Sequence, residues 1–305
     1  MSFKLQILGA NSAKPAYDRN QTAQILTVQN DLFLIDCGEG TQLQLNKYRI
    51  KINRIRHIFI SHLHGDHYYG LIGLLSTMHL QRRTTELYLY GPPGLSEILA
   101  LQFKYSDTVL NYKLHFREIE TEKKYIIFEN DNITVETIPL THRIPCAGFL
   151  FREKTKPMNL IKEKVNNKFS LADIATLKQG KDIVDENGTV VHKNRDYTHP
   201  AKKCRSYAYC SDTRYNEGIV DQIKDVDLLY HEATFLSERE ERAGETYHST
   251  AGQAASIAQK ANVGTLIIGH YSSRYKDLSP FLDEAKLIYN NTMLAIEGEC
   301  ISIND

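Results

Sequence analysis

The chain has 305 residues, and its 37 Lys and Arg residues balance 37 Asp and Glu residues, so the formal net charge is zero. A hydrophobic fraction of 42% over this length is enough for a substantial core in one large domain or two. Neutrality argues against nucleic-acid binding over the whole surface, and no uncharged run approaches the roughly 20 residues needed to cross a bilayer or resembles a secretion signal. We therefore expect a cytoplasmic protein without a membrane partner.

Short apolar runs separated by turn residues predict a β-rich chain. Turns are expected near Asn30-Asp31 and near Asn130-Asp131. The expected strands and hairpins are residues 4–8, 23–38, 55–61, 86–91 and 124–140, followed by 206–213, 227–235, 265–272 and a final run at 293–303.

Two helices are expected between the later strands. Residues 250–263 place Ala254, Ile257, Ala258 and Ala261 on one face, behind a cap at Ser249 or Thr250. Residues 279–291 have a proline near their start. This layout predicts two β-sheets covered by helices.

The segment from Phe151 to Arg205 carries an excess of positive charge. It contains thirteen Lys or Arg residues and seven Asp or Glu residues, a net of +6, so the remainder of the chain carries −6. With few aromatic residues and several turn signals, it is expected to be a protruding basic insertion rather than core. The alternative is a solvated loop whose lysines only keep it soluble.

The stretch SHLHGDHYYG, residues 61–70, follows an apolar strand and contains three histidines and an aspartate. His62 and His64 alternate by two, so their imidazoles project to one side, and Gly65 lets the chain turn before Asp66 and His67. Imidazole and carboxylate donors suit zinc, and the five cysteines of the chain form no CxxC pair. The motif therefore predicts an open, hydrolytic site that serves two adjacent metals.

Two metals need more ligands than this loop supplies. His142, Asp212 and His270 each follow an apolar strand, where side chains gather at the rim of a sheet. Taken singly, each would more often be a structural residue. Taken together, they suggest one metal held by His62, His64 and His142, another held by Asp66, His67 and His270, and Asp212 as a bridge.

The segments DCGEGTQ, SHLHGDH, PLTH, YCSDTR, HEATF, HSTAGQAA and GHYSSRY resemble the metallo-β-lactamase superfamily and, within it, the tRNase Z (ribonuclease Z) family. The likeness runs almost from the first residue to the last. SHLHGDH alone specifies the superfamily, whereas HSTAGQAA followed by GHYSSRY, with a basic insertion before YCSDTR, indicates the family. The resemblance implies an α/β fold, a four-layer αβ/βα sandwich formed by residues 1–305 as a single domain, with residues 151–205 as a flexible arm for tRNA.

The resemblance also implies an activity and its cofactors. Members of the family are zinc-dependent endoribonucleases that remove the 3′ trailer from precursor tRNA. They cut after the discriminator nucleotide and leave a 3′-hydroxyl on the tRNA and a 5′-phosphate on the trailer. We therefore expect two Zn²⁺ ions per subunit, a homodimer, precursor tRNA as partner and no DNA partner.

Roles for further residues follow from the same resemblance. Asp66 is the expected general base, His248 the proton donor to the leaving oxygen, and Glu232 the carboxylate that orients His248. Without the resemblance, His248 would be an ordinary polar residue near a helix start. The expected phosphate contacts are Ser249 and Arg274 beside the metals and Lys154 and Lys156 on the arm.

Two alternatives remain open at this point. One is a metal-dependent hydrolase of small phosphodiesters or esters on the same fold, for which a basic arm has little use. The other is a non-catalytic RNA-binding protein with structural metals, which would be expected to have lost at least one ligand. The arm departs from the family pattern, because residues 166–182 lack the Gly-Pro-rich loop of many bacterial members.

Overall fold

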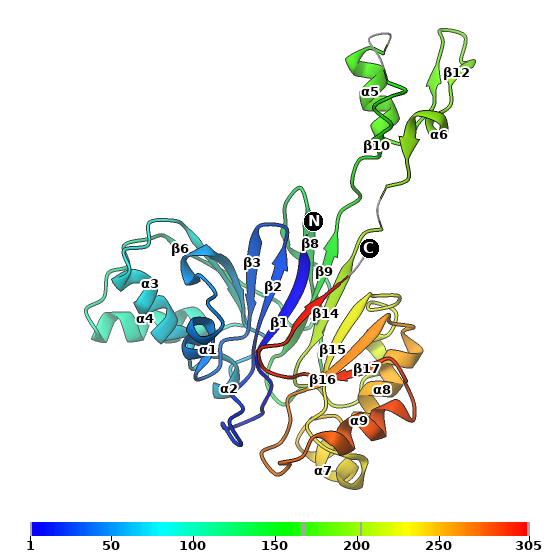
Figure 1. Ribbon diagram of the computed structural model, residues 1–305. Helices are drawn as coiled ribbons and strands as arrows, with labels where there is room; N and C mark the ends of the chain where they lie inside the picture. Colours follow the sequence, from blue (N-terminus) through cyan, green and yellow to red (C-terminus); the bar gives the residue numbers. More distant parts are fainter. Residues whose placement is uncertain (1, 166–168, 202, 304–305) are drawn as a thin grey trace.

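The computed structural model describes residues 2–165, 169–201 and 203–303, and its body contains two seven-stranded sheets (Figure 1). The first sheet has the strand order β18-β1-β2-β3-β4-β5-β6. Neighbours from β3 to β6 pair in parallel, whereas β1 pairs antiparallel with β2 and β18. Its strands are β1 (Phe3–Gly9), β2 (Ala23–Val28), β3 (Asp31–Ile35), β4 (Ile55–Phe59), β5 (Leu87–Gly91), β6 (Leu114–Glu118) and β18 (Cys300–Ser302).

The second sheet has the strand order β17-β16-β15-β14-β9-β8-β7. Neighbours from β14 to β17 pair in parallel, and β9 joins them antiparallel to β14. Its strands are β7 (Ile126–Glu129), β8 (Ile133–Pro139), β9 (Ala147–Glu153), β14 (Ser206–Cys210), β15 (Leu228–Glu232), β16 (Thr265–Gly269) and β17 (Thr292–Leu294).

Alternation along the strands of the first sheet divides the core into two parts. On β3, Phe33 and Ile35 pack in the core shared with the second sheet, whereas Leu32 and Leu34 pack on the opposite side with helices. This arrangement follows from the two-residue period of a strand. The layers are therefore helix, sheet, sheet and helix, and the expected four-layer sandwich is confirmed.

Helices cover the outer face of each sheet (Figure 1). A cap was expected at Ser249 or Thr250, and it is Thr250 that caps α8, in a capping box with Gln253. The described helices of the body are α1 (Thr41–Lys47), α3 (Leu71–Leu80) and α4 (Leu95–Tyr105) on the first sheet, α8 (Ala251–Lys260) and α9 (Ser279–Lys286) on the second, and the short α2 (Gly65–Tyr68), α7 (Glu240–Glu245), η1 (Ile52–Arg54), η2 (Glu217–Ile219) and η3 (Ser237–Arg239).

The chain between β9 and β14 projects away from the body (Figure 1). We call the described residues of 154–205 the arm. The insertion was expected from residue 151, but residues 151–153 complete β9, and Phe151 is buried in the core. The arm contains two two-stranded ladders and two helices: β10 (Asn159–Leu160) with β13 (Thr198–His199), β11 (Ile183–Val184) with β12 (Val190–His192), α5 (Leu171–Lys178) and α6 (Asn194–Tyr197).

Two details of the strands differ from those expected. The final run at 293–303 is two strands, β17 and β18, which lie in different sheets because the chain crosses from one to the other between them. Strands β6 and β9 were not expected. All five cysteines are free, and within the described ranges no helix is long and apolar enough to span a bilayer.

Candidate metal centre

The expected ligands lie where strands of the two sheets end. His62 and His64 follow β4 of the first sheet, whereas His142, Asp212 and His270 follow β8, β14 and β16 of the second. Because β8, β14 and β16 all point the same way, their carboxyl ends share one edge of the sheet. The structure thus brings together groups that are as much as 208 residues apart in the chain.

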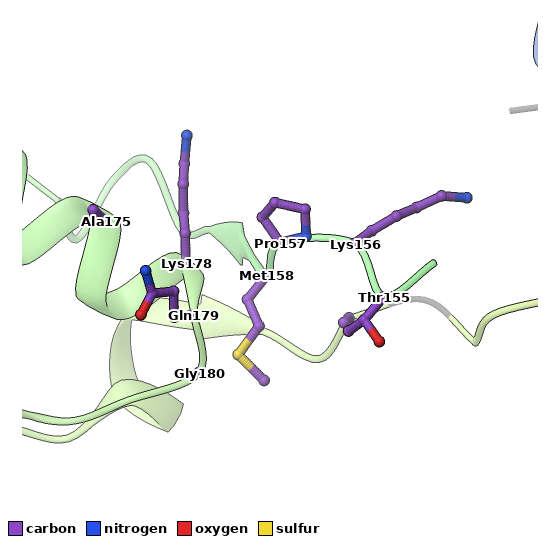
Figure 2. A pocket seen from close by; sticks show the side chains of 9 residues that line it. Thr155, Lys156, Pro157, Met158, Ala175, Lys178, Gln179 and Gly180 are labelled. Atoms are coloured by element: carbon purple, nitrogen blue, oxygen red, sulfur yellow. The ribbon is translucent and has the colours of Figure 1, made fainter. Parts of the chain in front are cut away.

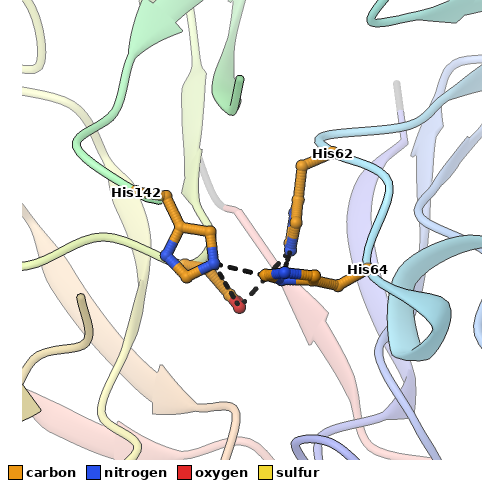
Figure 3. Close-up of side chains that lie close together, drawn as sticks. His62, His64 and His142 are labelled. Atoms are coloured by element: carbon orange, nitrogen blue, oxygen red, sulfur yellow. Dashed lines mark hydrogen bonds and ion pairs between the residues drawn. The ribbon is translucent and has the colours of Figure 1, made fainter. Parts of the chain in front are cut away.

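The first cluster contains His62, His64, His142 and Asp212, whose ligand atoms lie within 4.8 Å of one another. Nδ1 of His64 is 3.1 Å from Nε2 of His62 and 3.1 Å from Nε2 of His142. Figure 3 shows the three imidazoles converging on one point. Ring nitrogens that converge at this distance suit a shared cation.

The second cluster contains Asp66, His67 and His270. Oδ2 of Asp66 is 3.5 Å from Nε2 of His67 and 3.3 Å from Nε2 of His270. Asp212 faces both clusters: its Oδ2 is 3.4 Å from Nε2 of His62, and its Oδ1 is 3.3 Å from Nε2 of His67 and 3.1 Å from Nε2 of His270. One buried carboxylate therefore offers one oxygen to each cluster.

Hydrogen bonds to Asp36, at the end of β3, orient two of the imidazoles. Nδ1 of His67 donates to Oδ2 of Asp36 at 2.8 Å. The hydroxyl of Ser61 donates to the same carboxylate, so its oxygen accepts from Nδ1 of His62 at 3.0 Å. The hydroxyl of Tyr209 donates to Asp36 at 2.6 Å from the second sheet. These contacts leave Nε2 of both histidines as the ligand atom.

Two further imidazoles are oriented in the same way. The hydroxyl of Thr234 donates to Glu232 and therefore accepts from Nδ1 of His270 at 2.9 Å. Nδ1 of His142 donates to the backbone carbonyl of Tyr247 at 3.0 Å. His270 has a φ of 61°, a left-handed conformation that is unusual for a residue other than glycine and is typical of functional sites.

The protonation of these groups agrees with the needs of a metal site. Burial and the neighbouring imidazoles lower the pKa of His64 and His142 to about 4, so both are neutral near pH 7, the form that binds a cation. Burial alone would lower the pKa of His67, but the carboxylates of Asp212, Asp66 and Asp36 raise it. That surplus of negative charge would be neutralised by a cation at the second cluster. Imidazole and carboxylate donors without thiolate fit zinc.

His248 lies beside the clusters at the end of a short hydrogen bond. Its Nδ1 donates to Oε1 of Glu232 at 2.8 Å, and Glu232 also accepts from the backbone N–H groups of Thr213 and Thr234. Burial alone would lower the pKa of His248, but the charge of Glu232 and this hydrogen bond raise it to about 9. The imidazole is thus positively charged near neutral pH.

Ser249 and Arg274, the phosphate contacts expected beside the metals, lie in different environments. Ser249 is fully buried, and its hydroxyl donates to the carbonyl of Thr213 at 2.7 Å. Helix α8 begins only at Ala251, so Ser249 is also not at its first turn. The hydroxyl of Ser249 is therefore engaged by Thr213, and a phosphate contact of Ser249 stays a prediction. Arg274 is exposed on the segment after His270 and remains available to an anion.

Lys154 and Lys156 lie at the root of the arm and are already paired. Nζ of Lys154 is 2.5 Å from Oε1 of Glu129, and Nζ of Lys156 is 2.7 Å from Oε1 of Glu153. Figure 2 shows a hollow next to Lys156, with Pro157 and Met158 on one side and Lys178 nearby. The root of the arm thus contains lysines beside a largely apolar surface.

Several residues of the centre were not expected from the sequence. Ser61 and Thr234 orient ligands, and the backbone N–H of Ala13 donates to Oδ2 of Asp66 at 2.7 Å. Arg143 donates from Nε to Nε2 of His64 at 3.3 Å. Ser61 and Arg143 are neighbours of predicted ligands in the chain, which is a usable signal, whereas the contact of Ala13 depends on folding alone.

The fold and the paired clusters define a metallohydrolase of the metallo-β-lactamase type. Among solved structures, the metallo-beta-lactamase fold protein YhfI from Bacillus subtilis is similar in fold, with a TM-score of 0.70 and 16% identity over 99% of this chain and 100% of that chain. Human tRNase Z, short form, is similar with a TM-score of 0.73 and 27% identity over 99% of this chain and 100% of that chain.

Sequence comparison gives the family. Ribonuclease Z of Cytophaga hutchinsonii is 53% identical over 100% of this chain and 97% of its own length, and that of Bacteroides thetaiotaomicron is 47% identical over 99% and 96%. The family model described as Anti-Pycsar protein Apyc1 matches residues 3–176, a range that ends before Asp212, His248 and His270. The chain belongs to the ribonuclease Z family.

Proposed function

We propose that the protein is a zinc-dependent endoribonuclease that removes the 3′ trailer from precursor tRNA, cutting after the discriminator nucleotide. The observation that carries the proposal is the carboxylate of Asp212, which offers one oxygen to each of two clusters in a chain of the ribonuclease Z family. His62, His64 and His142 would hold one zinc ion, and Asp66, His67 and His270 the other. Two such ions supply an activated water and neutralise charge on the phosphodiester.

Asp66 is the proposed proton acceptor. Burial alone would raise its pKa, but the charge of His67 and hydrogen bonds from His67 and His270 lower it, so the carboxylate is ionised. The N–H of Ala13 fixes its Oδ2. As water attacks the phosphorus, its proton passes to Asp66, and the bond from phosphorus to the 3′-oxygen of the tRNA breaks. The phosphate stays on the trailer.

His248 is the proposed proton donor to the departing 3′-oxygen. It is charged because of Glu232, which acts as a positioning residue. Asp212, His248 and His270 also lie close enough to form a cation site. We favour the donor role because Nδ1 of His248 is engaged by Glu232 and is 4.0 Å from Asp212, farther than the histidine nitrogens of the clusters.

The arm is the proposed contact for the body of the tRNA. It leaves the sheet at the start of β14, whereas Asp212 follows the end of that strand, so the arm and the metal centre lie at opposite ends of it. Lysines on an exposed projection give salt-dependent affinity for phosphates without reading the base sequence. We also propose a homodimer, in which one copy's arm reaches RNA held by the other, and a cytoplasmic location because precursor tRNA is the substrate.

The experiment is cleavage of a 3′-extended precursor tRNA by the purified, zinc-loaded protein, with both product ends mapped. A single cut after the discriminator nucleotide, with a 3′-hydroxyl on the tRNA and a 5′-phosphate on the trailer, is expected. The same tRNA without a trailer is the control and should stay intact. Hydrolysis of bis(p-nitrophenyl) phosphate without any tRNA cleavage would instead indicate a small-molecule hydrolase.

A further inference from the structure

The outer nitrogen of His64 has a different partner from those of the other ligand histidines. His62, His67, His142 and His270 each present Nδ1 to an oxygen of Ser61, Asp36, Tyr247 or Thr234, the usual support for a metal ligand. His64 instead presents Nε2 to the guanidinium of Arg143, with Nε of Arg143 donating at 3.3 Å. Among the ligand histidines, all of which the structure describes, His64 is thus the one whose outer nitrogen meets a cation.

This contact constrains the proton of His64. A neutral imidazole carries one proton, on one of its two nitrogens. Because Nε2 accepts from Arg143, the proton lies on Nδ1, the nitrogen that faces His62 and His142 at 3.1 Å each. A cation bound at Nδ1 moves the proton to Nε2, where two N–H groups would then face each other. The contact with Arg143 and a cation on Nδ1 therefore exclude each other.

Arg143 is free to leave this position. Its side chain is exposed and, within the described ranges, makes no other hydrogen bond or ion pair. Arg214, which also follows a ligand in the chain, is held more firmly: its guanidinium lies 4.8 Å from the ring of Tyr247 and donates to the carbonyl of Gly244. Of these two arginines at the rim of the centre, Arg143 is the one with a single, displaceable contact.

We propose that Arg143 binds a phosphate of the RNA substrate after it is displaced from His64, and that its contact with His64 opposes binding of a cation to the first cluster. A guanidinium offers planar donors that match phosphate oxygens, and Arg143 stays next to His142 at the mouth of the centre. Metal loading and substrate binding are thereby coupled through one residue. The identity of the substrate rests on the proposed function, whereas the competition at His64 does not.

The first test measures zinc affinity, which does not depend on activity. The variants are Arg143→Gln, Arg143→Lys and, as a charge-matched control, Arg117→Gln on the exposed edge strand β6. Each is titrated with zinc in competition with a chromophoric chelator. Arg143→Gln should bind zinc roughly threefold tighter or more, because a cation is removed and the Gln carbonyl can accept from Nε2–H of His64. Arg117→Gln should match the wild type.

The second test measures binding of a 3′-extended precursor tRNA from the protein dependence of single-turnover cleavage. Arg143→Gln should need roughly tenfold more protein for half-maximal rate, the scale of one charge-assisted hydrogen bond. The slope of log affinity against log salt should fall by about one phosphate contact. Arg143→Lys should restore most of the binding, and Arg117→Gln should change neither quantity.

The outcomes distinguish an Arg143 that is displaced from His64 from an Arg143 that keeps this contact. Weaker zinc binding by Arg143→Gln would mean that Arg143 supports His64 structurally, and unchanged zinc binding would remove the competition; either result overturns the proposal. Tighter zinc binding with wild-type RNA affinity and salt slope would overturn the substrate contact. If the zinc-loaded wild type cuts no precursor tRNA, the proposed function fails, and the zinc titration still decides whether Arg143 opposes the cation.

Discussion

The metal centre and the arm differ in the interactions that hold them together. In the centre, the carboxylate of Asp36 accepts hydrogen bonds from His67, Ser61 and Tyr209. These residues come from both sheets, so a single carboxylate fixes side chains of both. The arm contains two short ladders, β10 with β13 and β11 with β12, and projects away from the body (Figure 1). Chemistry needs positions fixed to a fraction of an ångström, whereas recognition of an RNA by shape needs reach and charge. We therefore expect changes in the two regions to separate cleavage from binding.

The largest effect is expected for Asp212→Ala. Losing the carboxylate that faces both clusters should lower the bound zinc and reduce cleavage of precursor tRNA and of bis(p-nitrophenyl) phosphate by roughly 10³-fold or more. Metal analysis and both assays check this. The exposed Asp131→Ala, in the turn between β7 and β8, is the matched control and should behave as wild type. Full zinc content and activity in Asp212→Ala would refute the shared-carboxylate centre.

Replacing residues 155–203 by a short Gly-Ser linker should reduce cleavage of precursor tRNA but not hydrolysis of a small phosphodiester. Strands β9 and β14 are antiparallel neighbours, with Arg152 opposite Ser206, so a short connection can join them. We expect kcat/KM for precursor tRNA to fall by roughly 10³-fold, the scale of several lost phosphate contacts. Hydrolysis of bis(p-nitrophenyl) phosphate should remain within a factor of two or so. An equal loss of both activities would mean that the arm supports the centre.

His248→Ala should slow the chemical step without weakening the binding of zinc or of RNA. The loss of a proton donor typically costs roughly 10²-fold in rate. Single-turnover cleavage, zinc content and tRNA affinity are the three measurements. Wild-type cleavage by this variant would rule out the donor role, and loss of a zinc ion would make His248 a ligand, as its distance to His270 and Asp212 permits.

At the root of the arm, the smallest effect on activity is expected, and the change is one of stability. Glu153 forms two 2.8 Å hydrogen bonds with the buried guanidinium of Arg205. Burial alone would raise the pKa of Glu153, but Arg205 and Lys156 lower it to about 2, below its ordinary value of 4.5. The pair therefore stabilises the fold fully above about pH 4.5, and this stability is lost as the pH falls from 4.5 towards 2.

Glu153→Gln should lower the free energy of unfolding by about 3 kcal/mol at pH 7 and by progressively less as the pH falls below 4.5. Urea unfolding at several pH values measures this. Glu129→Gln is the control, because Glu129 and Lys154 form an exposed pair that contributes about 0.5 kcal/mol or less. A deficit in Glu153→Gln that does not change with pH would show that the ion pair is not its cause.

The sequence predicted the centre better than the arm for a physical reason. Apolar strands are recognised by composition, and His142, Asp212 and His270 directly follow such strands, so the fold was enough to bring them together. The arm has no comparable pattern. Residues 159–160 pair with 198–199 across almost forty positions, and two-residue strands leave no periodic signal.

Other details depend on contacts that a sequence does not show. The capping box of Ser170 and Asp173, which starts α5, is visible in the sequence, but it lies in the basic insertion, where no helix was expected. The burial of Ser249 follows from the position of β14, because its hydroxyl reaches the carbonyl of Thr213. Arg143 follows a ligand in the chain, yet its contact with His64 is made across the two sheets.

The most direct test of the two-cluster centre is a crystal structure of the zinc-loaded protein with anomalous scattering measured at the zinc edge. Two peaks roughly 3.5 to 4 Å apart are expected, one among His62, His64 and His142 and one among Asp66, His67 and His270, with the carboxylate of Asp212 between them. A single peak, or two peaks that leave Asp212 without a metal contact, would contradict the two-cluster centre.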